Sequence, residues 1–260
     1  MRIMGFKHRT VSVPIRYPVI SSVRQSSEIV LVLLDIQTDE GIQGISYAQA
    51  FHQHGAVAIR SCLNLLESVI KGDDPTAVET IWRKMWEATK LLGHQGLSTF
   101  AVSMVDMALW DMLGKSMNIP VYRMLGGQSC KVPAYASDGL WLVKPMQAAQ
   151  EAEAFVQLGF STMKMRLGRT EKEDLQAIHE VKHAVGDHIE ILGDVNQGWT
   201  SEHAVHMGER INPYQLGWIE EPIDAEDLQG YVHLTRSVDT CIATGENLYG
   251  TRSFQRFLEA

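Results

Sequence analysis

The sequence has little cysteine, and what it has is unpaired. Cys62, Cys130 and Cys241 are scattered along 260 residues, and none belongs to a CxxC spacing. We therefore expect neither a disulfide framework nor a cysteine zinc site. Buried thiols that act as small hydrophobic side chains, in a reducing compartment, are the prediction.

Long hydrophobic runs are also missing. The longest strongly apolar run, residues 29–34, is too short to cross a bilayer, and residues 1–10 contain no apolar core of signal-peptide length. These absences predict a cytoplasmic protein with no membrane partner.

The chain has no surplus of positive charge. Its formal net charge is -8 and its pI is about 5.7, so we expect no nucleic-acid partner, and any positive site must be small. With 45% hydrophobic and 21% charged residues, the composition is that of an ordinary globular protein and excludes a disordered one.

The first half of the chain is predicted to form strands and then helices. A hairpin turn at residues 39–41 joins two of the expected strands, and a polar, serine-rich loop that could move is expected at residues 16–27. The strands of this antiparallel meander are expected at residues 9–15, 27–38 and 41–49, and helices at 56–70, 73–92 and 98–117, the last two starting at Asp74–Thr76 and at a capping Ser98.

The second half alternates strand-like and helix-like segments. Repeated βα units of this kind predict a parallel sheet, either open or closed. Strands are expected at residues 132–137, 162–168, 189–196, 216–222 and 240–247, and helices at 144–159, 171–186, 200–212, 224–238 and from 249 onward.

Two cations interrupt the apolar strand at residues 162–168. Lys164 and Arg166 share one face of this strand, because side chains alternate across a strand. That face is either the solvated side of an edge strand or the lining of a charged site.

Three later strands end in acidic residues. Asp194, Glu220 and Glu246 follow one another at intervals of 26 residues, so we expect them side by side at the carboxyl ends of the sheet. Converging carboxylates repel one another and require a cation, and an all-oxygen set with room for water favours Mg2+ over Ca2+. The alternative is that these acids only cap helices, a role that Asp fills often and Glu rarely.

The motifs "TMKMRLG", "GDVNQGW", "WIEEP" and "ATGEN", with "VDMALWDMLGK" and "RMLGG" before them, resemble the mandelate racemase branch of the enolase superfamily. The resemblance runs along the whole chain. It implies an α/β fold, in which an α+β capping domain (residues 1–125) precedes a modified TIM barrel (residues 126–260).

The resemblance also implies a chemistry. Asp194, Glu220 and Glu246 would bind Mg2+, which holds the carboxylate of a small-molecule substrate while a base removes the α proton. Lys164 would neutralise the carboxylate oxygens, and Asn196 could hydrogen-bond the substrate.

The chain departs from the family pattern in two ways. Family members commonly carry a lysine base where this sequence has Arg166, which is a poor base and is expected to bind substrate or stabilise charge. The histidine and aspartate that would supply a base on the opposite face are not found. We therefore expect a C-terminally truncated barrel of about five strands, whose exposed edges would limit solubility.

Polar residues near the expected capping loops bear on the substrate. Arg24 and His52 are predicted to contact it and suit a hydroxylated acid, so the preferred chemistry is dehydration of an aldonate or aldarate to a 2-keto-3-deoxy acid. A racemase or epimerase of a 2-hydroxy acid, a zinc amidohydrolase that uses "HQH" at residues 52–54, and an inactive fragment are the alternatives. A homo-oligomer is expected.

Overall fold

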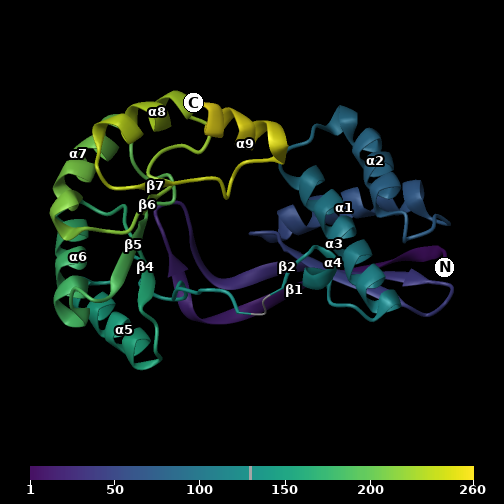
Figure 1. Cartoon of the computed structure of the whole chain (residues 1–260), viewed down its shortest axis with the longest axis horizontal. Helices are drawn as coiled ribbons and strands as arrows, with labels where there is room; N and C mark the ends of the chain where they lie inside the picture. Colours follow the sequence, from purple (N-terminus) through teal and green to yellow (C-terminus); the bar gives the residue numbers. More distant parts are fainter. Residues whose placement is uncertain (129–130) are drawn as a thin grey trace. The chain divides into compact units, whose positions relative to one another are not determined.

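The computed structural model describes residues 1–128 and 131–260, so the expectation for Cys130 lies outside the described residues (Figure 1). The chain divides into two compact units. Unit 1 comprises Met1–Ile15 and Glu28–Lys131, and unit 2 comprises Arg16–Ser27 and Val132–Ala260. The boundary between residues 125 and 126 stays a prediction. Within the described residues, no helix is long and apolar enough to cross a membrane.

A three-stranded sheet, in the order β1-β2-β3, is built from β1 (Ile3–Ile20), β2 (Gln25–Thr38) and β3 (Gln43–Gln49), and β3 pairs antiparallel with β2. Alternate side chains of β2, from Val30 to Ile36, are buried, as expected for a sheet covered on one face.

The expected loop at residues 16–27 is wrong. β1 continues to Ile20 and β2 begins at Gln25, leaving a short turn closed by the Ser21 N–H, which donates to the Arg24 carbonyl at 2.9 Å. Sheet pairing uses backbone groups, and β-branched and aromatic side chains such as Tyr17 and Val19 favour it despite polar neighbours.

Helices cover this sheet in unit 1. α1 (Gln53–Ile70) and α3 (Leu97–Met117) supply most of the core that buries β2, and α2 (Val78–Ala88) and the short α4 (Val121–Met124) complete the helices. Two predicted helix starts are wrong. Asp74 accepts the N–H and hydroxyl of Thr76 in a turn before α2, and the Ser98 hydroxyl donates to the Gly93 carbonyl at 2.6 Å.

Unit 2 contains the predicted βα repeats. Its parallel sheet has the order β4-β5-β6-β7, and helices α5 to α8 form an arc around one side of it (Figure 1). The elements are α5 (Pro145–Gln157), β4 (Thr162–Arg166), α6 (Glu171–Val185), β5 (Glu190–Asp194), α7 (Ser201–Ile211), β6 (Ile219–Glu220), α8 (Leu228–Ser237), β7 (Ile242–Ala243) and α9 (Gly250–Glu259).

The strand expected at residues 132–137 is reduced to one isolated parallel bridge between Ala136 and Met163. The Ala136 N–H donates to the Thr162 carbonyl at 3.0 Å, and the Lys164 N–H donates to the Ala136 carbonyl at 2.8 Å. Pro133 has no N–H to extend this pairing toward the N-terminus.

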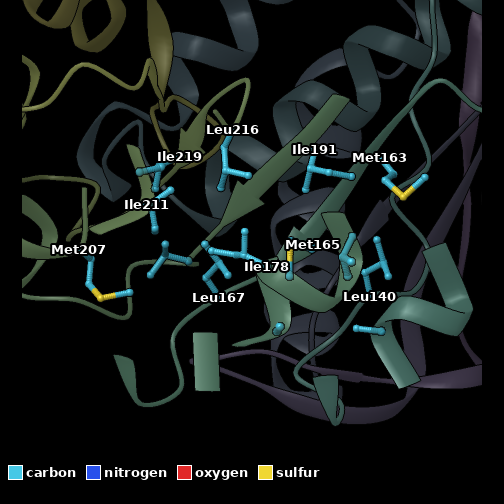
Figure 2. Packing of buried hydrophobic residues seen from close by; sticks show 14 of the residues in the cluster. Leu140, Met163, Met165, Leu167, Ile178, Ile191, Met207, Ile211, Leu216 and Ile219 are labelled. Carbon is cyan, nitrogen blue, oxygen red and sulfur yellow. The ribbon is translucent and has the colours of Figure 1, made fainter. Parts of the chain in front are cut away.

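The core of unit 2 lies between the sheet and its helices. Met163 and Met165 of β4, and Leu167 directly after it, are buried on the helix side of the sheet, where Figure 2 shows them with Ile178 of α6. In β5, a side chain at Gly193 would lie 2.9 Å from Leu167 Cδ1, so glycine permits this close packing. Because side chains alternate, the charged residues of β4 are turned to the opposite face.

Candidate active site

Three charged residues lie in one row across the sheet. Arg166 pairs with Asp194, Asp194 pairs with Glu220, and Glu220 pairs with Ala243. Glu246 therefore comes three residues after the position that completes the row. The expectation that Glu246 ends a strand as Asp194 and Glu220 do is wrong, because connections of equal total length can divide differently between strand, helix and loop.

Lys164 joins two of the acids. Its Nζ lies 2.9 and 3.0 Å from the two carboxylate oxygens of Glu220 and 3.0 Å from Asp194 Oδ2, and Arg166 Nη1 lies 3.3 Å from the same Asp194 oxygen. Lys164 is 6% exposed and Arg166 is 8% exposed. The alternative of a solvated edge face is therefore excluded for these two side chains.

Aromatic rings accompany these charges. The Arg166 guanidinium lies 4.7 Å from the centre of the Trp141 ring, and Lys164 Nζ lies 5.9 Å from the centre of the Tyr135 ring. The Trp218 indole N–H donates to Glu220 Oε2 at 3.2 Å. Ring faces attract cations and restrict their positions, so the two cations are held on the sheet by more than their ion pairs.

The electrostatics of the cluster favour a charged Lys164. Burial by itself lowers the pKa of Lys164, but its hydrogen bond to Glu220 and the charge of Asp194 outweigh burial, so the pKa is raised. Burial raises the pKa of Glu246, and the charges of Asp194 and Glu220 raise it further. Glu246 therefore lies within the electrostatic influence of the other two acids, although the residue retains access to solvent.

A magnesium site is only partly assembled. Asp194 and Glu220 converge on one cationic atom, Lys164 Nζ, as two ligands of a metal ion would. In residues 1–128 and 131–260, however, no three His, Cys, Asp or Glu side chains are gathered closely enough to hold an ion. The carboxylate oxygens of Asp194, Glu220 and Glu246 are the ligand atoms that a hard divalent cation prefers, and such an ion would offset the repulsion between the three charges.

The helix-capping alternative is wrong. The side chain that caps α7 belongs to Thr200, the one that caps α8 belongs to Asp227, and the residue before α9 is Tyr249. The acids at the strand ends are therefore available for another role.

A buried carboxylate that was not predicted lies beside these acids. Glu221 is 1% exposed, and burial, followed by the charge of Glu246, raises its pKa to about 7. Asn247 Nδ2 donates to Glu221 Oε2 at 2.7 Å and Gln197 Nε2 donates to it at 3.2 Å. The only sequence signals are their positions next to the predicted ligands, in "WIEEP", "GDVNQGW" and "ATGEN".

Asn196 lies at a strained position just after β5. Its φ is 48°, and its N–H donates to Asp194 Oδ1 at 3.0 Å. A non-glycine residue in this region is uncommon and is found often at functional sites. The predicted contact of Asn196 with substrate stays a prediction.

The tip of the β1–β2 hairpin belongs to unit 2 and lies on the strand-end loops. Ser22 Oγ donates to the carbonyls of Val195, at 2.5 Å, and Asn196, at 3.1 Å. A side chain at Gly198 would lie 2.7 Å from Ser22 Cβ, so this contact requires glycine. Arg24 is in the same tip, where its carbonyl closes the turn, and its contact with substrate stays a prediction.

His52 has a structural role in unit 1. Its Nδ1 accepts the Gly55 N–H at 3.0 Å and so caps α1. The "HQH" segment therefore begins a helix and does not end a barrel strand, which removes the basis for the zinc amidohydrolase alternative. Substrate binding by His52 stays a prediction.

Comparison with known proteins identifies the family. Residues 3–126 match the mandelate racemase / muconate lactonizing enzyme N-terminal domain, and residues 147–260 match the enolase C-terminal domain-like family. A crystal structure of an enolase from alpha proteobacterium bal199 with bound Mg is 32% identical, with a TM-score of 0.95, and the match covers 99% of this chain and 72% of that one. The chain belongs to the mandelate racemase / muconate lactonizing enzyme family of the enolase superfamily.

Two further relatives differ in the reactions that their names state. A racemase from Streptomyces coelicolor A3(2) with bound magnesium is 28% identical with a TM-score of 0.94, and the match covers 99% of this chain and 72% of that one. The L-talarate/galactarate dehydratase of Salmonella typhimurium is 29% identical over 89% of this chain and 58% of its own length. The chain spans about three fifths of the curated relatives that it matches.

Proposed function

We propose that this chain carries the magnesium-binding part of an enzyme that removes the proton α to a carboxylate, and that the reaction is dehydration of an acid sugar. The observation that carries the proposal is the convergence of Asp194 and Glu220 on the buried Lys164 ammonium, at 3.0 and 2.9 Å, at the carboxyl ends of parallel strands. This is the end of a parallel sheet at which ligands bind.

Asp194, Glu220 and Glu246 would hold the metal. When bound, Mg2+ supplies positive charge to the carboxylate oxygens of the substrate. Glu246 is exposed and follows the row of paired residues, so its side chain is free to complete the set when the ion is present. Lys164 would remain protonated beside the substrate carboxylate and stabilise the negative charge that develops on loss of the α proton.

Arg166 would bind an anionic group of the substrate. Its Nε is buried and has no hydrogen-bond partner within the described part of the chain, so a donor remains for a carboxylate. Guanidinium stays charged at neutral pH and cannot accept the α proton. This favours one-sided proton removal, as in a dehydratase, over racemisation, which needs a base on each face.

The dehydratase among the relatives supports an aldonate or aldarate substrate, and Asn196 would hydrogen-bond one of its hydroxyl groups. The racemase among the relatives supports the second candidate, racemisation or epimerisation of a 2-hydroxy acid. In the proposed dehydration the α proton leaves, the 3-hydroxyl takes up a proton and departs as water, and the enol becomes a 2-keto-3-deoxy acid.

Proton NMR in deuterium oxide tests the proposal. An enzyme that combines this magnesium-binding part with a general base is incubated with MgCl2 and a panel of aldonates and aldarates, and the expected result is a 2-keto-3-deoxy acid that EDTA abolishes. Lys164→Met should lower the rate by about 100-fold or more, because one preorganised charge is lost. Exchange at the α carbon without a keto product would favour the racemase, and the absence of magnesium-dependent turnover would contradict both candidates.

A further inference from the structure

Glu221 is a buried carboxylate to which the proposed function gives no role. It directly follows the candidate ligand Glu220, it is 1% exposed, and its backbone has a φ of 36°. Residues held at such angles cost free energy and persist only where their surroundings fix them. The contacts of Glu221 therefore indicate what this position is held for.

Three loops meet at this carboxylate. Glu221 Oε2 accepts Asn247 Nδ2 at 2.7 Å from the loop after β7, and Gln197 Nε2 at 3.2 Å from the loop after β5. Gln197 is itself at a φ of 64°, and its N–H donates to the Glu221 carbonyl at 2.6 Å. Its side-chain oxygen accepts the Ala225 N–H at 3.0 Å. We call Gln197, Glu221 and Asn247 the amide frame.

Each member of the amide frame lies within three residues of a different candidate ligand. Gln197 follows Asp194 by three positions, and Glu221 and Asn247 come directly after their ligands in the chain. The sheet itself pairs Asp194 with Glu220 but ends at Ala243, before Glu246. Within the described strands, sheet pairing thus sets the register of the first two ligands, and the bond from Asn247 to Glu221 ties the third loop to them.

We infer that the amide frame positions the three candidate magnesium ligands and so sets the affinity for Mg2+, an inference that rests on the proposed function. Contacts that orient ligands from behind commonly change metal affinity by about 10–100-fold when they are removed. Glu221 is the centre of the frame and acts through its neighbours as a positioning residue.

The test is Mg2+ binding to the 260-residue chain, measured by isothermal titration calorimetry, with the melting temperature in EDTA as a separate measure of folding. Asn247→Ala breaks one bond of the frame, on a residue whose surface is exposed, and Glu221→Leu removes the shared acceptor. Both should weaken Mg2+ binding by about tenfold or more. Asn247→Ala should change the melting temperature in EDTA only slightly.

Two further variants make the test specific. Glu221→Gln keeps one oxygen to accept the Asn247 and Gln197 donors, and its amide group can take the place of Oε1, which has no hydrogen-bond partner in the described residues. It should bind Mg2+ nearly as wild type does. Asn212→Ala is the matched control, because Asn212, at the end of α7, donates from Nδ2 to Asp239 Oδ2 at 3.1 Å, in segments that precede β6 and β7. It should leave the affinity unchanged.

The outcomes separate the two proposals. Wild-type affinity in both Asn247→Ala and Glu221→Leu would overturn the inference and leave the proposed function standing. If Asn212→Ala weakened Mg2+ binding equally, the inference would also be overturned, because loss of any side-chain amide hydrogen bond would then be enough to lower the affinity. If wild type showed no saturable Mg2+ binding, the proposed function would fail, and the amide frame would lose its assigned role with it.

Discussion

Lys164 is the side chain on which two carboxylates converge. Its ammonium group forms ion pairs with both Asp194 and Glu220, and the side chain is nearly inaccessible to solvent. A buried ion pair adds little net stability compared with an apolar replacement of the whole pair, but loss of one partner leaves the other charge uncompensated. At this position the free energy of folding and the proposed chemistry depend on the same residue.

Lys164→Met should lower the free energy of unfolding in EDTA by about 3–5 kcal/mol, because Glu220 would lose its cation and Asp194 would keep only the 3.3 Å contact with Arg166 Nη1. Excess Mg2+ should restore part of this loss by binding the folded state. Urea unfolding with EDTA and with MgCl2 measures both effects. Lys115→Met is the control, since the exposed Lys115–Asp111 pair should contribute less than about 1 kcal/mol. An equal loss in the two variants would contradict the prediction.

At the scale of an element, α6 connects the strand that carries Lys164 and Arg166 to the strand that ends at Asp194. Its start is fixed by a capping box, in which the Glu173 N–H donates to Thr170 Oγ1 at 3.4 Å and the Thr170 N–H donates to Glu173 Oε2 at 3.3 Å. The Thr170 hydroxyl also donates to Glu173 Oε2, at 2.6 Å. The hydroxyl and then the N–H of Thr170 lower the pKa of Glu173.

Thr170→Ala should lower the free energy of unfolding by about 1 kcal/mol at neutral pH. Because the folded-state pKa of Glu173 lies below its unfolded value, the stabilisation is present above the unfolded pKa of about 4.3 and is lost as the pH falls through the folded value. The difference between wild type and variant should therefore shrink in acid, as measured by urea unfolding at neutral and acidic pH.

The control for this prediction is Thr200→Ala at the start of α7. Thr200 accepts the His203 N–H at 3.2 Å without a carboxylate partner of the capping-box kind. The loss of unfolding free energy caused by Thr200→Ala should be the same at neutral and acidic pH. A Thr170→Ala cost that did not change with pH would show that Glu173 takes no part in the cap.

At the scale of the molecule, residues 1–128 and 131–260 contain two separate hydrophobic cores. One consists of residues of unit 1, such as Leu63 of α1, and the other of residues of unit 2, such as Ile191 of β5. Lys164, Arg166 and the three candidate ligands all belong to unit 2. Each core can therefore be weakened without touching the other.

Leu63→Ala should cost about 2–5 kcal/mol, because Leu63 is fully buried and leaves a cavity. Hydrogen exchange followed by mass spectrometry should show faster exchange in Met1–Ile15 and Glu28–Lys131, with Mg2+ binding unchanged. Ile191→Ala should do the reverse, with faster exchange in the second unit and weaker Mg2+ binding. Faster exchange throughout the chain in both variants would contradict the independence of the two cores.

Much of this protein could be predicted from its sequence. The βα repeats, the shared face of Lys164 and Arg166 and the strand-end positions of Asp194 and Glu220 follow from local sequence patterns, because side-chain alternation in a strand does not depend on distant residues. The family followed from motifs that are specific as a set. The course of β1 through residues 16–20 did not, since backbone pairing with a partner strand outweighed the polar composition.

The sequence by itself determined which charges are available and in what order the strands supply them. Only the tertiary structure decided which of them meet. The register places Arg166, Asp194 and Glu220 in one row and leaves Glu246 beyond it, and the bonds of Glu221 to Gln197 and Asn247 tie the loops together. Register and loop contacts depend on how whole elements pack, and intervals along the chain do not contain that information.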